Sequence, residues 1–195
     1  MKKITVCIVG HGPSLKGAKK GNLIDSHDKI VRLKGAKHVL GTEDYGNRVT
    51  SVCASTEIMG TFFGINAQEF WAYPKNGSFN GYGAINVISR LELPVMIPLY
   101  FCNEWNQRFR DMGAKHPNVS TGTAAILIAI KRWVPKRILL AGFDTLLDPT
   151  IEFDRNPAIP RSGHGPYPNH DWEKELELIR ILEKEYGVKI ECMNQ

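Results

Sequence analysis

The chain has 195 residues, of which 43% are hydrophobic and 23% charged, and its formal net charge is +5. This length suits one domain with its own core, so we expect residues 1–195 to form a single domain. No apolar run approaches the roughly 20 residues of a membrane span, and the dispersed lysines form no basic run for nucleic acid. We therefore expect a cytoplasmic protein with no transmembrane segment, no nucleic-acid partner and four reduced, scattered cysteines.

The N-terminal stretch combines a buried strand with a glycine-containing loop. Residues 4–9 are mostly β-branched or apolar and too few for a helix, and Gly-His-Gly-Pro-Ser follows at 10–14. The glycines allow a ligand to approach the backbone, and Ser14 is suited to cap a short helix whose free amides bind phosphate. A turn without a ligand explains these residues equally well, because the third glycine of the dinucleotide fingerprint is missing.

Strands and helices are predicted to alternate along the chain. A turn is expected at 24–28 and a polar loop at 41–48, and residues 145–169 form either a functional loop or a disordered segment. The alternation predicts an α/β fold with three layers and a mostly parallel sheet of about seven strands, with ligands beyond the carboxyl ends of the strands. The predicted strands cover 4–9, 29–33, 49–54, 69–73, 95–99, 137–141 and 188–192, and the predicted helices 84–91, 103–111, 120–133 and 172–186.

A second candidate anion site precedes the long apolar stretch that ends at Trp133. Ser120 or Thr121 provides a hydroxyl to cap the helix, and Gly122 leaves its first amides open to an anion. Considered alone, these residues are explained more simply by an ordinary helix cap without a ligand.

The last long helix is predicted to begin beside a histidine. Asn169 or its neighbour is expected to cap this helix, with Asp171 in the first turn. The positive end of a helix disfavours a charged imidazole, which suits His170 as a general base. His164 and Tyr167 stand close to His170 in sequence, although a histidine at a helix start is often only a surface residue. Metal binding by the two histidines is an alternative, but the chain has no D-x-D pair, so we expect no essential metal.

Taken in order, these segments resemble the eukaryotic-type sialyltransferase family. Residues 7–17 and 24–33 are similar to its long sialyl motif, 44–50 to a short acidic-Gly-basic-Thr element, and 120–143 to its small motif. His170 and Glu175 match its last motif. The first loop is also similar to that of bacterial sialyltransferases. Four matches in the same order are more specific than any one of them.

The resemblance implies a Rossmann-like (modified GT-A) fold and a glycosyltransferase that moves sialic acid, or a similar 2-keto acid sugar, from a CMP-sugar donor. The transfer would proceed with inversion and without a metal or other cofactor, onto a glycan or lipid-linked glycan, with His170 as the base. On a regular helix Glu175 lies about 140° around from His170, so we expect no direct pairing if both are helical, and we interpret Glu175 as structural. The residues that the resemblance assigns to donor binding are Gly10, His11, Gly12, Ser14, Arg32, Lys34, Ser120, Thr121, Gly122, Gly142, His164 and Tyr167.

The chain departs from the family pattern at two positions in the donor site. The family usually has asparagine where His11 and Lys34 stand, which leaves the identity of the sugar open. The family's membrane anchor and the disulfide between its long and small motifs are also missing, as expected of a bacterial or viral short form. A non-catalytic nucleotide-binding module and a hydrolase of CMP-sugars are the alternative functions.

Overall fold

The computed structural model describes residues 3–34, 39–55, 65–73, 95–96, 99–147 and 170–193. The described residues contain a seven-stranded sheet of order β5-β4-β3-β2-β1-β6-β7, in which every neighbouring pair is parallel. This arrangement confirms the α/β class and the parallel sheet. The strands are β1 (Thr5–Val9), β2 (Lys29–Leu33), β3 (Ser51–Ser55), β4 (Glu69–Tyr73), β5 (Val95–Met96), β6 (Arg137–Ala141) and β7 (Lys189–Cys192).

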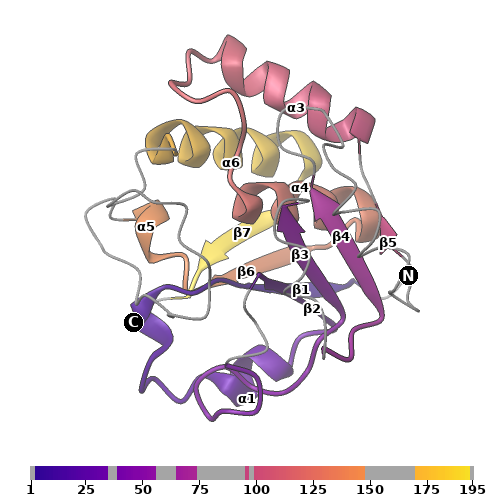
Figure 1. Cartoon of the computed structure of the whole chain (residues 1–195), viewed down its shortest axis with the longest axis vertical. Helices are drawn as coiled ribbons and strands as arrows, with labels where there is room; N and C mark the ends of the chain where they lie inside the picture. The colour runs from indigo at the N-terminus through magenta and orange to yellow at the C-terminus, as the bar shows by residue number, and fades with distance from the viewer. Residues whose placement is uncertain are drawn as a thin grey trace.

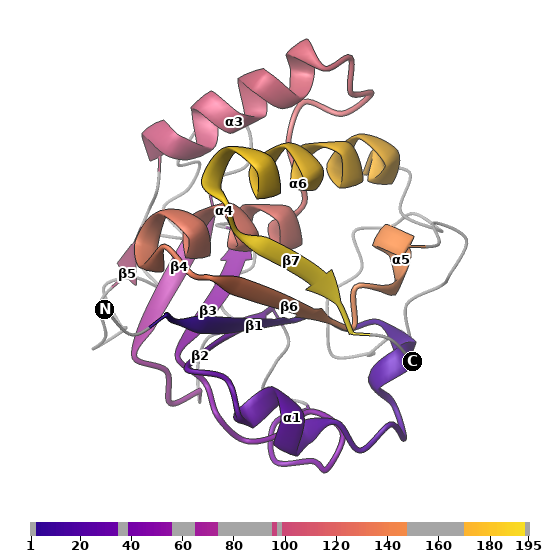
Figure 2. The same cartoon turned by 180° about the vertical axis from the view of Figure 1, so that it is seen from behind.

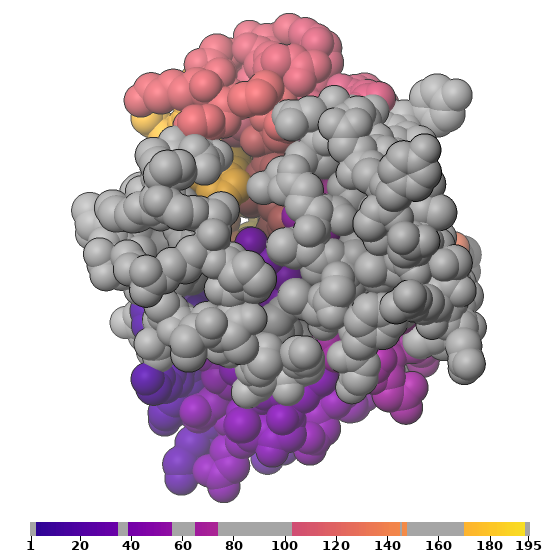
Figure 3. Space-filling view, viewed as in Figure 1, coloured from indigo at the N-terminus to yellow at the C-terminus, as the bar shows by residue number. Residues whose placement is uncertain are grey.

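Helices cover the two faces of the sheet unequally (Figures 1 and 2). The short α1 (Gly21–Asp25) lies on one face, whereas α4 (Thr121–Trp133) packs on the other face against β1 to β4. The helix α6 (Trp172–Tyr186) contacts α4 and β7, and α3 (Leu99–Asp111) packs on α6 and forms the top of the space-filling view (Figure 3). The 3₁₀ helix η1 (Pro13–Leu15) and α5 (Asp144–Leu147) are short. Within the described ranges, no helix has both the length and the apolar character needed to cross a bilayer.

The core follows from the two-residue period of the strands. Val6 and Ile8 of β1 belong to the cluster on the α4 face, while Cys7 and Val9 belong to a smaller cluster on the α1 face. The helix α4 is buried along most of its length, as its apolar sequence predicted. Its first turn is therefore held firmly against the sheet.

Several element boundaries differ from the predicted ones. The strand expected over 95–99 ends at Met96, and α3 begins at Leu99 rather than at 103. Trp105 and Phe109, four positions apart, are buried in the core and anchor this helix. Part of the turn expected at 24–28 belongs to α1. The helix predicted over 84–91 and positions 148–169 of the long loop lie outside the described residues.

Candidate functional site

The first glycine loop is closed by hydrogen bonds within the chain. The amide of Gly10 donates to the carbonyl of Ala141 (2.8 Å), and the amide of Gly12 donates to that of Gly142 (2.9 Å). A Cβ atom at Gly10 would lie 2.5 Å from the Gly142 carbonyl oxygen, and Gly142 itself has a φ of +66°. These glycines bring two chain segments together, and the amides of Gly10 and Gly12 are used within the chain. Binding of a donor by this loop stays a prediction.

Ser14 makes a different contact from the predicted one. It lies inside η1 and does not cap a helix. Its amide donates to Oδ2 of Asp144 (2.8 Å), and its hydroxyl donates to Oδ1 of the same carboxylate (2.5 Å). The Asp144 carboxylate is buried. The pKa of the Cys192 thiol is raised, first because the thiol is itself buried and second because the negative charge of Asp144 acts on it. Asp144 was not among the predicted site residues, because its role follows from the pairing of β6 with β1 and not from a local motif.

The two positions that depart from the family pattern contact each other. Nε2 of His11 contacts the backbone carbonyl of Lys34, the residue that follows β2. Both residues are half-buried. The contact ties the first loop to the carboxyl end of β2, and a role of either side chain toward a donor stays a prediction.

Arg32 lies on the opposite face of the sheet from α4. Val31 packs on the α4 face, so the next side chain along β2 points toward α1. The guanidinium is 1% exposed and donates to the carbonyls of Tyr45 (2.7 Å) and Arg48 (3.0 Å), with Asp25 at 3.7 Å. Burial lowers the pKa of this guanidinium to about 10. Arg32 thus holds the loop after β2 in place, and its contact with a donor stays a prediction.

The first turn of α4 combines a cap with two amides that make no bond within the helix. The hydroxyl of Ser120 accepts a hydrogen bond from the amide of Thr123 (3.1 Å), as a helix cap does. The amides of Thr121 and Gly122 follow, and no bond within the helix uses them because they stand in its first turn. Of the two anion sites that the sequence suggested, this is the one whose amides are not used by a bond within their own element.

A phenylalanine connects this turn to the first glycine loop. A Cβ atom at Gly122 would lie 2.7 Å from the ring of Phe143, and one at Gly10 would lie 3.3 Å from the same ring. The two glycine-bearing segments are therefore neighbours with one aromatic ring between them. Phe143 follows β6, and the sequence motifs did not single it out as a contact.

His170 lies directly before α6 and not within it. The helix is capped by Asp171, whose carboxylate accepts from the amide of Lys174 (3.3 Å), so the cap expected at Asn169 or its neighbour is wrong. Because His170 is not helical, the 140° separation does not apply, and its Nδ1 lies 3.5 Å from Oε1 of Glu175. The imidazole also packs against the ring of Trp172, with 4.8 Å between the centroids.

Glu175 joins His170 to the first turn of α4. Its side chain is fully buried, and Oε1 accepts from the amide of Ser120 (3.0 Å). Oε2 accepts from the hydroxyl of Ser120 (2.5 Å) and from that of Thr123. The structure thus brings together His170, Glu175 and the α4 turn. His164 and Tyr167 lie outside the described residues.

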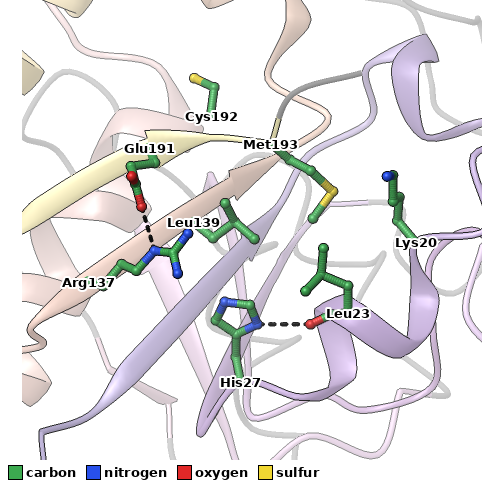
Figure 4. Close-up of a pocket in the computed structure, with 8 residues that line it drawn as sticks. All are labelled: Lys20, Leu23, His27, Arg137, Leu139, Glu191, Cys192 and Met193. Atoms are coloured by element: carbon green, nitrogen blue, oxygen red, sulfur yellow. Dashed lines mark hydrogen bonds and ion pairs between the residues drawn. The ribbon is translucent and has the colours of Figure 1, made fainter.

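A separate pocket of about 270 Å³ lies on the α1 face of the sheet (Figure 4). None of the predicted site residues lines it, and its rim is held by the Arg137–Glu191 ion pair (2.5 Å) and by His27 bonded to the Leu23 carbonyl (3.0 Å). In the part of the chain that is described, no three His, Cys, Asp or Glu side chains form a group able to hold a metal ion. The lining residues are Lys20, Leu23, His27, Arg137, Leu139, Glu191, Cys192 and Met193.

Comparison with known proteins gives one family match and several structural matches. Residues 2–76 match the model of glycosyltransferase family 29 (sialyltransferase). The fold is similar to that of a mammalian sialyltransferase, with a TM-score of 0.59 and 18% identity, over 96% of this chain and 68% of the other. A mammalian sialyltransferase in complex with Gal-beta-1-3GalNAc-ortho-nitrophenol gives a TM-score of 0.54 and 17% identity, over 96% and 69%. No curated protein sequence matches the chain.

Proposed function

We propose that this chain is a glycosyltransferase of the sialyltransferase family that transfers sialic acid, or a similar 2-keto acid sugar, from a CMP-sugar to a hydroxyl group of a glycan. The family match supports the broader assignment to glycosyltransferases that use a nucleotide-sugar donor and a glycan acceptor. The CMP-sugar donor, inversion at the sugar carbon, independence from metal ions and a cytoplasmic location are the finer parts of this proposal.

The contact between His170 and Glu175 is the observation that carries the proposal. Nδ1 of His170 faces the Glu175 carboxylate at 3.5 Å. The proposal assigns the other ring nitrogen, Nε2, to the acceptor hydroxyl. The same carboxylate holds Ser120 at the start of α4. A base and an anion-binding turn are thus linked through one buried residue.

This arrangement suits an inverting transfer. The acceptor hydroxyl gives its proton to Nε2 of His170 while its oxygen attacks the anomeric carbon of the sugar. The bond from that carbon to the phosphate oxygen breaks, and CMP leaves with the bonding electrons. The Glu175 carboxylate stabilises the imidazolium that forms beside it. The open amides of Thr121 and Gly122, at the positive end of α4, are suited to the charge that develops on the phosphate.

Measuring CMP release from CMP-sialic acid, with and without glycan acceptors, tests this proposal. The wild-type chain is expected to release CMP in an acceptor-dependent way, and His170→Ala to reduce the rate by about 10²- to 10⁴-fold while CMP binding is retained. His116→Ala, in the segment between α3 and α4, serves as the matched control and is expected to keep its activity.

The other outcomes separate the alternatives. CMP release that needs no acceptor would identify a hydrolase of CMP-sugars. Binding of CMP without release under any acceptor condition would identify a non-catalytic nucleotide-binding module. Full activity in His170→Ala would remove His170 as the base.

A further inference from the structure

The hydrogen-bond donors of the first glycine loop are almost all used within the chain. Between positions 10 and 16, the amides of Gly10, Gly12, Leu15 and Lys16 donate to backbone carbonyls. Residue 13 is a proline and has no amide hydrogen. The amide and hydroxyl of Ser14 both donate to one carboxylate. A loop of this composition ordinarily offers such donors to phosphate. Here backbone carbonyls accept from four of the amides, and one internal group accepts from both donors of Ser14.

That internal group is the carboxylate of Asp144. One of its oxygens accepts from the Ser14 amide at 2.8 Å and the other from the Ser14 hydroxyl at 2.5 Å, the pairing of amide and hydroxyl that also holds bound anions. A Cβ atom at Gly12 would overlap with this carboxylate. The glycine therefore makes room for Asp144 itself. With 6% of its surface exposed, Asp144 forms part of the packed wall between the first loop and the end of β6.

This carboxylate has an electrostatic consequence for a nucleotide. The start of α4 offers open amides to one phosphate, but the neighbouring loop offers a negative charge where open donors would be needed for a second phosphate. A nucleoside diphosphate carries more negative charge than a monophosphate, so it meets a larger repulsion beside Asp144.

We propose that Asp144 restricts the donor to nucleoside monophosphate sugars by filling, from within the chain, the anion position of the first glycine loop. This inference rests on the proposed function and deepens it, because it assigns the discrimination between donor classes to one residue. The hydrogen bonds from Ser14 to Asp144 also hold the first glycine loop closed, so the same residue sets the shape of the loop and the choice between donor classes.

Calorimetric titration of CMP and CDP into the wild-type chain and into Asp144→Asn tests the inference. The wild-type chain is expected to bind CMP more tightly than CDP. The Asp144→Asn variant keeps the size of the side chain and loses its charge, so the affinity ratio should move toward CDP by about tenfold. Asp111→Asn, at the exposed end of α3, changes the net charge by the same amount and should leave the ratio unchanged.

Each result has a distinct meaning. A wild-type chain that binds CMP and CDP equally well overturns the inference without any variant. The inference can therefore be disproved even if the Asp144→Asn protein folds poorly. An unchanged ratio in folded Asp144→Asn, or an equal change in Asp111→Asn, also overturns it while the proposed function stands. A wild-type chain that binds no CMP removes the proposed function, and the inference falls with it.

Discussion

Glu175 is a fully buried carboxylate that accepts hydrogen bonds from three groups of the α4 turn. In Glu175→Gln one acceptor oxygen becomes an NH₂ donor that faces the hydroxyls of Ser120 and Thr123. We expect the free energy of unfolding to fall by about 2–3 kcal/mol, since hydrogen bonds to buried charges contribute that much. Urea unfolding measures the change when the dependence of the free energy of unfolding on urea concentration (the m-value) is the same in the variant and the wild-type chain.

Glu177 on the same helix provides the matched control for this variant. Its carboxylate is exposed and pairs with Lys174 at 2.8 Å, so Glu177→Gln should change the free energy of unfolding by less than about 1 kcal/mol. Equal losses in the two variants would contradict the buried network around Glu175.

The site could be predicted from sequence only where one local segment determines it. Ser120 caps α4 as expected, because a hydroxyl directly before an apolar helix specifies a cap. The roles of Asp144 and Glu175 could not be predicted in this way. The role of Asp144 depends on which strands are neighbours in the sheet. The contact of Glu175 with His170 depends on the exact start of α6, because His170 stands one residue before the helix cap. Helix ends are the least certain boundaries in a prediction from sequence.

At the scale of elements, α4 and the turn after β6 meet at Gly122 and Phe143. In Gly122→Ala the new Cβ would lie 2.7 Å from the ring, so the ring or the helix must shift. We expect a loss of about 1–3 kcal/mol in the free energy of unfolding, as for other overpacked contacts. Chemical unfolding of the purified variant measures it.

A double-mutant cycle assigns that loss to the contact between the two elements. Phe143→Leu removes the ring edge, so the loss in the double variant should be smaller than the sum of the two single losses. Strict additivity would show that Gly122→Ala acts through the helix alone and would contradict the contact.

Element positions were predictable where the hydrophobic pattern is strong and the boundary is marked. The strands over 29–33, 69–73 and 137–141 coincide with their predictions, and α6 ends at Tyr186 before Gly187, which has a φ of +61°. The start of α3 was missed because Leu99 and the apolar residues after it read equally well as strand. The buried partners of Trp105 and Phe109, which belong to the tertiary structure, decide in favour of the helix.

At the scale of the whole molecule, the sheet separates two unlike faces (Figures 1 and 2). The His170 and Glu175 contact and the first turn of α4 lie on the face with the larger core cluster. The pocket beside α1 lies on the other face. The fold class followed from the alternation of strands and helices, whereas the unequal cover of the faces depends on the lengths of α1 and α4.

Because most of the described strands and the helices α3, α4 and α6 share one large core cluster, a ligand that binds the folded state should stabilise the chain against unfolding. At a CMP concentration of 100 times Kd, mass action contributes about 2.7 kcal/mol, which for a chain of this size raises the unfolding temperature by roughly 5–10 °C. UDP, GDP and NAD at the same concentration should raise it less, and His170→Ala should keep the full CMP shift because the base does not hold the nucleotide. Thermal unfolding followed by circular dichroism gives these shifts, and an equal shift with GDP or NAD would contradict the cytidine assignment on which the donor class depends.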